Sequence, residues 1–140
     1  MLECRMHKPW PSVLLTIFLA VTALLLVGYS RNEVQRANDI KAAIRATGGN
    51  PDRGPDKIKY YGCSACHTIP GIAEANGKVG PPLDAFAWRI YIAGRVANTP
   101  DNLRHWIMNP HQIEQHTAMP EMGVSDEDSK DIAAYLYTLH

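Results

Sequence analysis

The chain has 140 residues, enough for one domain of ordinary size and an additional segment. Its 14 basic and 14 acidic residues cancel, which argues against nucleic-acid binding because that function uses a clustered basic surface. Its three cysteines are not the even, dispersed set of a disulfide-stapled secreted domain: Cys63 and Cys66 lie within one pentapeptide, and Cys4 stands alone with no assigned role.

The N-terminal segment contains a long apolar run. Residues 11–29 carry no charged side chain, and as a helix they would span roughly 28 Å, about the thickness of the hydrocarbon core of a bilayer. Trp10 and Tyr29 flank the run, as aromatic residues flank membrane helices. The alternative is a cleaved secretion signal with Arg5 and Lys8 as its basic region, but the run is longer than the apolar part of such signals. We therefore expect a retained anchor.

Residues 32–47 show the periodicity of a helix, because their apolar side chains recur every three or four positions. These side chains are Val34, Ala37, Ile40 and Ile44. Residues 48–51, Gly-Gly-Asn-Pro, are expected to end this helix and to form a flexible hinge, since paired glycines have the freest backbone. Two interpretations of the helix stay open: a solvated spacer, or a narrow apolar stripe that rests on a partner subunit.

The next predicted element is a short helix that begins near Gly54, with Pro55 at its first position, and runs into Tyr61. Residues 68–100 are rich in glycine and proline. They show no alternation of apolar and polar residues that would predict a strand, so turns and loops are expected there.

Two helices are expected in the C-terminal part. Residues 101–108 form one of them, capped near Thr99 or Asp101, and the other begins after Ser125, whose hydroxyl suits an N-cap. The apolar face of this last helix consists of Ile132, Tyr135, Leu136 and Leu139. Short helices joined by long loops bury little apolar surface, so another group is expected to fill the middle of the domain.

The pentapeptide Cys-Ser-Ala-Cys-His at residues 63–67 predicts that group. Cys-x-x-Cys-His is the attachment signature of c-type haem: two thiols three residues apart reach one porphyrin, and the adjacent His67 binds the iron. A thioredoxin-like redox pair is the first alternative, but no strand is predicted before the motif. A zinc site that recruits His111 and His116 is the second, but its spacing from Cys66 is too long for a zinc finger.

Residues 51–139 resemble a class I cytochrome c. The resemblance rests, in chain order, on Cys63-x-x-Cys66-His67, Gly80-Pro81-Pro82-Leu83, Thr117-Ala118-Met119-Pro120 and the helix Asp131–Leu139. It implies an all-α fold of short helices and loops around one covalently bound haem c, here preceded by a single transmembrane helix. It also implies that the first and last helices cross through a small residue and an aromatic one, with Gly54 or Ile58 and Tyr135 as the candidates.

The resemblance implies that a methionine binds the iron opposite His67. Met119 is the candidate because Pro120 follows it, whereas the nearby Met122 would be a packing residue. Bis-histidine ligation through His116 is the alternative. A histidine–methionine pair fills all six positions of the iron, so it suits single-electron transfer and leaves no position for a substrate.

Three further residues receive roles around the haem. By resemblance, the Pro81 carbonyl accepts a hydrogen bond from His67. Arg89 and Trp106 are candidates to meet the haem propionates, because buried carboxylates need charged or N–H donors. Each also has a simpler interpretation: a stiff proline loop, a surface arginine and a core tryptophan. A narrower likeness, to the cytochrome domains attached to haem–copper oxidases, rests on residues 89–94, residues 98–103 and Trp106-Ile107.

The expected domain organisation follows from these elements. Residues 1–30 are a cytoplasmic tip and a transmembrane anchor, residues 31–50 a helical spacer and hinge, and residues 51–140 the cytochrome c domain. Because haem c is attached on the periplasmic side of a bacterial inner membrane, the domain is expected to lie there.

The expected function is one-electron transfer between respiratory or photosynthetic complexes, by a carrier that is not itself an enzyme. Its partners would be the membrane and other electron-transfer proteins, such as a terminal oxidase or a quinol-oxidising complex, with no nucleic acid and no small-molecule substrate. The alternatives are a permanently bound cytochrome c subunit of an oxidase or dehydrogenase, a haem peroxidase or sensor, and a zinc-binding membrane adaptor.

Overall fold

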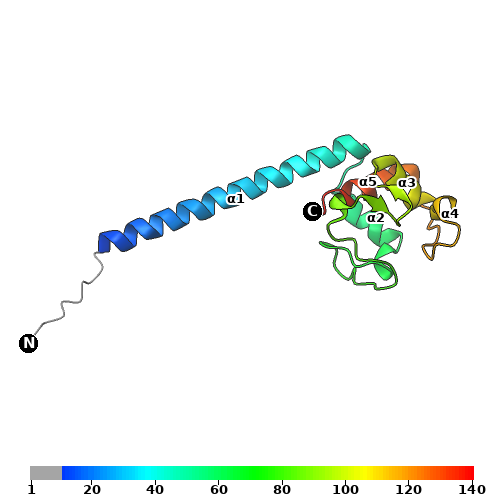
Figure 1. Ribbon diagram of the computed structural model, residues 1–140, viewed down its shortest axis with the longest axis horizontal. Coiled ribbons are helices and arrows are strands. Elements are labelled where there is room, and N and C mark those ends of the chain that lie inside the picture. Colours follow the sequence, from blue (N-terminus) through cyan, green and yellow to red (C-terminus); the bar gives the residue numbers. More distant parts are fainter. Residues whose placement is uncertain (1–10) are drawn as a thin grey trace, which may run out of the picture. The chain divides into compact units, whose positions relative to one another are not determined.

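The computed structural model describes residues 11–140 of the chain. The expected cytoplasmic tip, with Cys4 and Trp10, lies outside the described residues. The described chain forms two compact units that divide between Arg36 and Ala37, and each is described by itself (Figure 1).

Helix α1, Pro11–Thr47, joins the expected anchor and the expected spacer into one helix without a break. No residue of its most apolar stretch is buried against the protein. By length and composition, α1 is long and apolar enough to cross a membrane. The first unit therefore consists of a helix whose apolar surface has no partner within the described chain.

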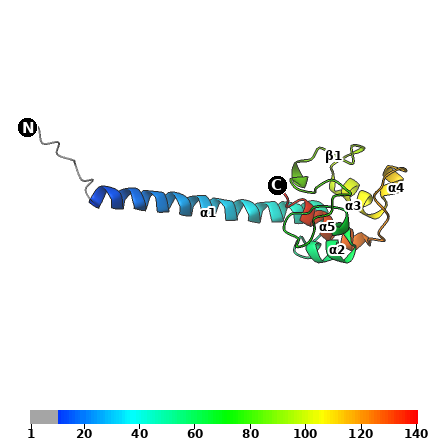
Figure 2. The same ribbon diagram turned by 90° about the horizontal axis from the view of Figure 1, so that it is seen from below.

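The second unit is mostly helical, as expected. Its elements are α2 (Gly54–Tyr60), the 3-10 turns Cys63–Ala65 and Phe86–Trp88, the strands β1 (Tyr91–Ile92) and β2 (Val96–Ala97), and the helices α3 (Pro100–Met108), α4 (Pro110–Ile113) and α5 (Asp126–Leu136). The antiparallel β1–β2 hairpin pairs Tyr91 with Ala97. Figure 2 shows the hairpin on one side of this unit and α2 on the other, with α3 and α5 between them.

Local sequence explains where the helices begin. The Thr99 hydroxyl accepts a hydrogen bond from the Asn102 amide at 3.3 Å, and the Ser125 hydroxyl accepts one from the Asp128 amide at 3.1 Å. Both side chains therefore satisfy a backbone N–H that has no partner in the first helical turn. The predicted caps of α3 and α5 are confirmed.

The core forms where α5 packs against α2 and α3. A Cβ atom at Gly54 would lie 2.4 Å from the Cβ atom of Tyr135, so only glycine allows α2 to approach α5 this closely. The expected crossing of a small residue and an aromatic one is thus confirmed, with Gly54 as the small residue. The buried apolar side chains of the core include Ile58, Phe86, Leu103, Ile132 and Leu136.

The end of α1 belongs to the second unit, and it buries the predicted apolar stripe only in part. Ala43 and Thr47 are buried and Ile40 of the stripe is half-buried, whereas Val34 and Ile44 are exposed. Ile40, Ala43 and Thr47 are spaced by three and four residues, so they share one face of the helix.

A buried carboxylate holds the segment that follows α1. Asp131, in α5, is 1% exposed and accepts a hydrogen bond from the Asn50 amide at 2.7 Å. The Arg53 guanidinium also lies 2.8 Å from this carboxylate, and the charge of Asp131 raises the pKa of Arg53. Residues 50–53 are thus tied to α5 by charge-assisted hydrogen bonds.

Candidate haem site

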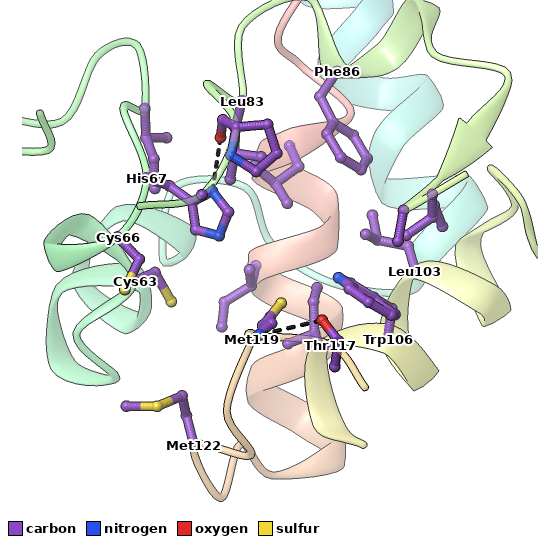
Figure 3. Close-up of a pocket in the computed structure, with 18 of the residues that line it drawn as sticks. Cys63, Cys66, His67, Leu83, Phe86, Leu103, Trp106, Thr117, Met119 and Met122 are labelled. Carbon is purple, nitrogen blue, oxygen red and sulfur yellow. Dashed lines mark hydrogen bonds between the residues drawn. The ribbon is translucent and has the colours of Figure 1, made fainter. Parts of the chain in front are cut away.

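The second unit encloses a cavity of about 300 Å³ with mostly apolar walls. Residues from α2, the loops, β1, α3 and α5 line it, among them Ile58, Leu83, Phe86, Leu103 and Ile107. Figure 3 shows the labelled polar and sulfur-bearing residues that surround this space.

The Cys-x-x-Cys-His segment enters the cavity as one tight turn. The Cys66 and His67 amides both donate to the Cys63 carbonyl, at 3.2 and 3.0 Å, so the three side chains emerge from a single turn. Cys63 and Cys66 are free thiols, and all three residues line the cavity. Burial raises the pKa of the Cys63 thiol, so this side chain is neutral at physiological pH.

The orientation of His67 is set by two contacts. The Nδ1 atom lies 2.7 Å from the Pro81 carbonyl oxygen, and it donates a hydrogen bond to that oxygen in the tautomer that carries the proton on Nδ1. A Cβ atom at Gly80 would lie 2.3 Å from Cε1 of the ring, so the imidazole rests directly on the backbone there. The other ring nitrogen points into the cavity (Figure 3), where it is free to bind a metal ion.

Met119 and Met122 lie differently. Met119 points into the cavity opposite the Cys-x-x-Cys-His turn, and its amide donates to the Thr117 hydroxyl at 3.2 Å (Figure 3). Met122 also lines the cavity, but it is 41% exposed (Figure 3). The third candidate ligand, His116, has a 92% exposed side chain and does not line the cavity.

Arg89 and Trp106 both line the cavity. The Arg89 guanidinium donates to the Pro82 and Asp84 carbonyls and lies 5.2 Å from the centre of the Phe86 ring, so it also braces the loop that carries these residues. The indole nitrogen of Trp106 faces the cavity (Figure 3). Sequence reasoning did not foresee the bracing role of Arg89, because a guanidinium that binds backbone carbonyls leaves no residue pattern.

The cavity fits a c-type haem. Two free thiols on one turn, an imidazole nitrogen and a thioether face an apolar space, and these are the donors that c-type attachment and axial ligation use. A zinc site is poorly supported, because residues 11–140 contain no group of three or more His, Cys, Asp or Glu side chains that could hold a metal ion. His111 and His116 do not line the cavity.

Comparisons with known proteins agree with this geometry. Residues 50–136, more than half of the chain, match the family model described as cytochrome c oxidase, cbb3-type, subunit III. Over 89 residues the chain is 33% identical to cytochrome c oxidase subunit 2 of Alkalihalophilus pseudofirmus (strain ATCC BAA-2126 / JCM 17055 / OF4). That match covers 63% of this chain and 25% of the relative, so the chain spans about a quarter of the relative's length. No solved structure matches. The chain therefore belongs to the family of c-type cytochromes that is described as cytochrome c oxidase, cbb3-type, subunit III.

Proposed function

We propose that this protein is a membrane-anchored mono-haem cytochrome c that transfers single electrons to or within a terminal oxidase complex, on the periplasmic side of a bacterial inner membrane. The observation that carries the proposal is the convergence of Cys63, Cys66, His67 and Met119 on one apolar cavity. Family membership supports the haem c and the electron-transfer role.

Each residue of the site has a separate role in the proposal. The Cys63 and Cys66 thiols would attach the haem, and the His67 imidazole and the Met119 thioether would bind its iron. The haem would supply a one-electron redox couple. The Pro81 carbonyl holds the His67 ring in place, as outer-shell partners of metal-binding histidines do.

The residues around the propionates follow from the same geometry. Trp106 directs an N–H into the cavity, so it is the better placed donor for a propionate. Arg89 uses part of its five N–H donors on the Pro82 and Asp84 carbonyls and keeps others available. We propose that Trp106 donates to a propionate directly and that Arg89 both braces the loop and contributes positive charge.

The proposed organisation has one boundary, between Arg36 and Ala37, in place of the two that the sequence predicts after residues 30 and 50. Helix α1 up to Arg36 is the membrane anchor and its exposed continuation. Residues 37–47 belong with the cytochrome c domain, because the compact unit begins at Ala37. Periplasmic location rests on the attachment of haem c in that compartment.

A second candidate role is a permanent subunit of an oxidase. The family description names an oxidase subunit, and so does the name of the relative. A mobile carrier would migrate alone after solubilisation in mild detergent, whereas a permanent subunit would co-purify with its partners. The buried contacts of residues 43–53 with the domain favour the permanent subunit, since a mobile carrier gains from a free tether.

Purification of the full chain from membranes tests the proposed function. We expect covalent haem on a denaturing gel, a reduced-minus-oxidised spectrum of a six-coordinate c-type cytochrome, and no change of that spectrum when carbon monoxide is added to the reduced protein. A colourless protein would contradict the haem assignment. A spectrum that changes with carbon monoxide would show an open iron position, and would favour a peroxidase or a sensor.

A further inference from the structure

The segment that carries Met119 has no regular structure to hold it in place. Residues 114–125, here called the Met119 loop, join α4 to α5 and form neither helix nor strand. Residues 117–120 of this loop line the cavity. Because loops are more mobile than the helices they connect, a side chain that must keep one position on such a loop needs specific contacts to fix it. The beginning of the loop supplies these contacts.

Glu114, the first residue of the loop, begins a series of hydrogen bonds that reaches Met119. Oε1 of its carboxylate accepts a hydrogen bond from the His116 amide at 3.2 Å. The Glu114 carbonyl accepts one from the Thr117 amide at 3.1 Å. The Thr117 hydroxyl then accepts one from the Met119 amide at 3.2 Å (Figure 3). The position of Met119 therefore depends, through two short turns, on the position of Glu114.

The second oxygen of this carboxylate, Oε2, forms an ion pair with the Arg95 guanidinium of the β1–β2 hairpin. The tip of the hairpin fixes where Arg95 lies. Ala93 and Gly94 turn the chain with positive φ angles of 51° and 67°, and the Arg95 amide donates to the Ile92 carbonyl at 2.9 Å. Ile92 and Ala93 themselves line the cavity, so Arg95 extends from a wall of the cavity.

The ion pair between Arg95 and Glu114 thus connects two walls of one cavity, the hairpin and the Met119 loop. Neither side chain lines the cavity itself. The Arg95 side chain is 60% exposed, and an ion pair in contact with water contributes little to the overall stability of a fold. Its location between two loops that enclose the cavity is therefore better explained by the position of those loops than by the stability of the domain.

We propose that Arg95 and Glu114 are positioning residues for Met119. Their ion pair holds the beginning of the Met119 loop against the hairpin, and the hydrogen bonds that follow keep the thioether directed into the cavity. The inference rests on the proposed function, in which Met119 is a ligand of the haem iron. Without the pair, the loop should open locally more often while the helices stay folded, and Met119 should leave the iron more often.

Imidazole binding to the oxidised, detergent-solubilised full chain tests the proposal. Imidazole takes the iron position of Met119, so at high imidazole concentration the observed rate is the rate at which Met119 leaves. Arg95→Gln should raise this rate about threefold, in keeping with the modest strength of a partly exposed ion pair. Glu114→Gln should raise it by a similar factor, because glutamine keeps the acceptor for the His116 amide and loses the charge. The double variant should be no faster than the single variants, since all three remove the same pair.

Two control variants and a second measurement separate positioning from general stability. Arg104→Gln removes another arginine–carboxylate pair, the one that joins α3 to Asp126 of α5, and it should leave the imidazole rate unchanged. Arg95→Lys keeps the positive charge and should stay close to the wild-type rate. In Arg95→Gln the amides of Thr117 and Met119 should exchange hydrogen faster, whereas those of α5 should exchange as in the wild type.

Three results would overturn the positioning role while the proposed function stands. They are an unchanged imidazole rate in Arg95→Gln and Glu114→Gln, an equal acceleration by Arg104→Gln, and effects that add in the double variant. A wild-type protein that carries no covalent haem, or whose spectrum lacks the thioether–iron band, contradicts the proposed function itself. That failure is visible before any variant is made, and it removes the positioning role as well, because Met119 then has no iron to bind.

Discussion

Met119 and Met122 are three residues apart but differ in what they can bind. Both side chains line the cavity, but Met119 points into it and Met122 is 41% exposed (Figure 3). We predict that Met119→Ala keeps covalent haem but loses the weak long-wavelength absorption band of a thioether–iron bond. Its reduction potential should fall, because methionine ligation favours the reduced iron. An optical spectrum and a redox titration measure both properties.

Met122→Ala is the matched control for this prediction. It removes the same side chain from the same loop, and it should change neither the band nor the potential. If the two variants exchanged their effects, Met122 would be the ligand. If neither variant had an effect, the result would favour bis-histidine ligation of the iron through His116.

Tyr137 is a residue whose ionisation opposes folding. Its hydroxyl donates to the Asn98 side-chain oxygen at 2.9 Å, and burial raises its pKa to about 12. Because the pKa of an unfolded tyrosine is about 10, the folded state favours the protonated phenol. The stabilisation is fully present below pH 10 and is lost as the pH rises through the folded-state pKa.

We therefore predict that the free energy of unfolding falls between about pH 10 and pH 12 and that Tyr137→Phe reduces this fall. Denaturant titrations at several pH values, carried out on both proteins, measure the difference. Tyr60→Phe is the control, because Tyr60 is an exposed tyrosine on α2. An equal alkaline loss in wild type and Tyr137→Phe would show that other groups cause it.

At the level of elements, the junction between α1 and the domain is a packed contact. Gly49 is buried, and a Cβ atom there would lie 2.1 Å from the Lys130 carbonyl oxygen of α5. Gly48 ends the helix with a left-handed φ of 71°, and a Cβ atom there would meet nothing within 4 Å. The two glycines therefore have different roles: Gly48 turns the chain and Gly49 allows the close approach.

This difference predicts unequal costs. Gly48→Ala should lower the free energy of unfolding by about 1–2 kcal/mol, the cost of a left-handed alanine. Gly49→Ala should lower it by roughly 3 kcal/mol, because α5 must move to admit the methyl group. Chemical denaturation measures both, and amide exchange at residues 43–53 shows whether the contact opens. Equal costs for the two variants would favour a flexible hinge at this position.

Some elements were predictable from sequence because their signals are local. The first turns of α2, α3 and α5 follow from Pro55, Thr99 and Ser125, which act within their own helix. The two-residue strands of the β1–β2 hairpin are too short to show alternation, and four-residue α4 is too short to show a helical period. The hairpin and α4 were therefore missed.

The residues of the site likewise divide into those with a local sequence signal and those without one. Cys63, Cys66 and His67 are recognisable because the chemistry requires them in one short motif. The contacts of Asp131 with Asn50 and Arg53 join residues about 80 positions apart, and no local sequence pattern predicts contacts of that kind. The partial exposure of Met122 was likewise not predictable, because it depends on the path of a loop.

For the molecule as a whole, the cavity occupies the place of a core. Its walls include Ile58, Leu103, Ile107 and Ile132, which are among the most buried side chains of the second unit. If no group covered these walls, their apolar side chains would meet water, and exposing a single Leu or Ile side chain costs about 1.5–3 kcal/mol. Several such side chains together would cost as much as the whole stability of an ordinary domain, about 5–15 kcal/mol.

The last prediction follows from this comparison. The double variant Cys63→Ala with Cys66→Ala cannot attach haem, so the domain should lose most of its structure although every helix sequence is unchanged. Amide hydrogen exchange in the detergent-solubilised full chain measures the effect, with α2 and α5 as reporters. Fast exchange in both helices is expected, while the apolar part of α1 should stay protected in its detergent micelle, because its backbone hydrogen bonds are internal to the helix. Slow exchange in α2 and α5 of the haem-free chain would show that their mutual packing is sufficient to fold the domain without haem.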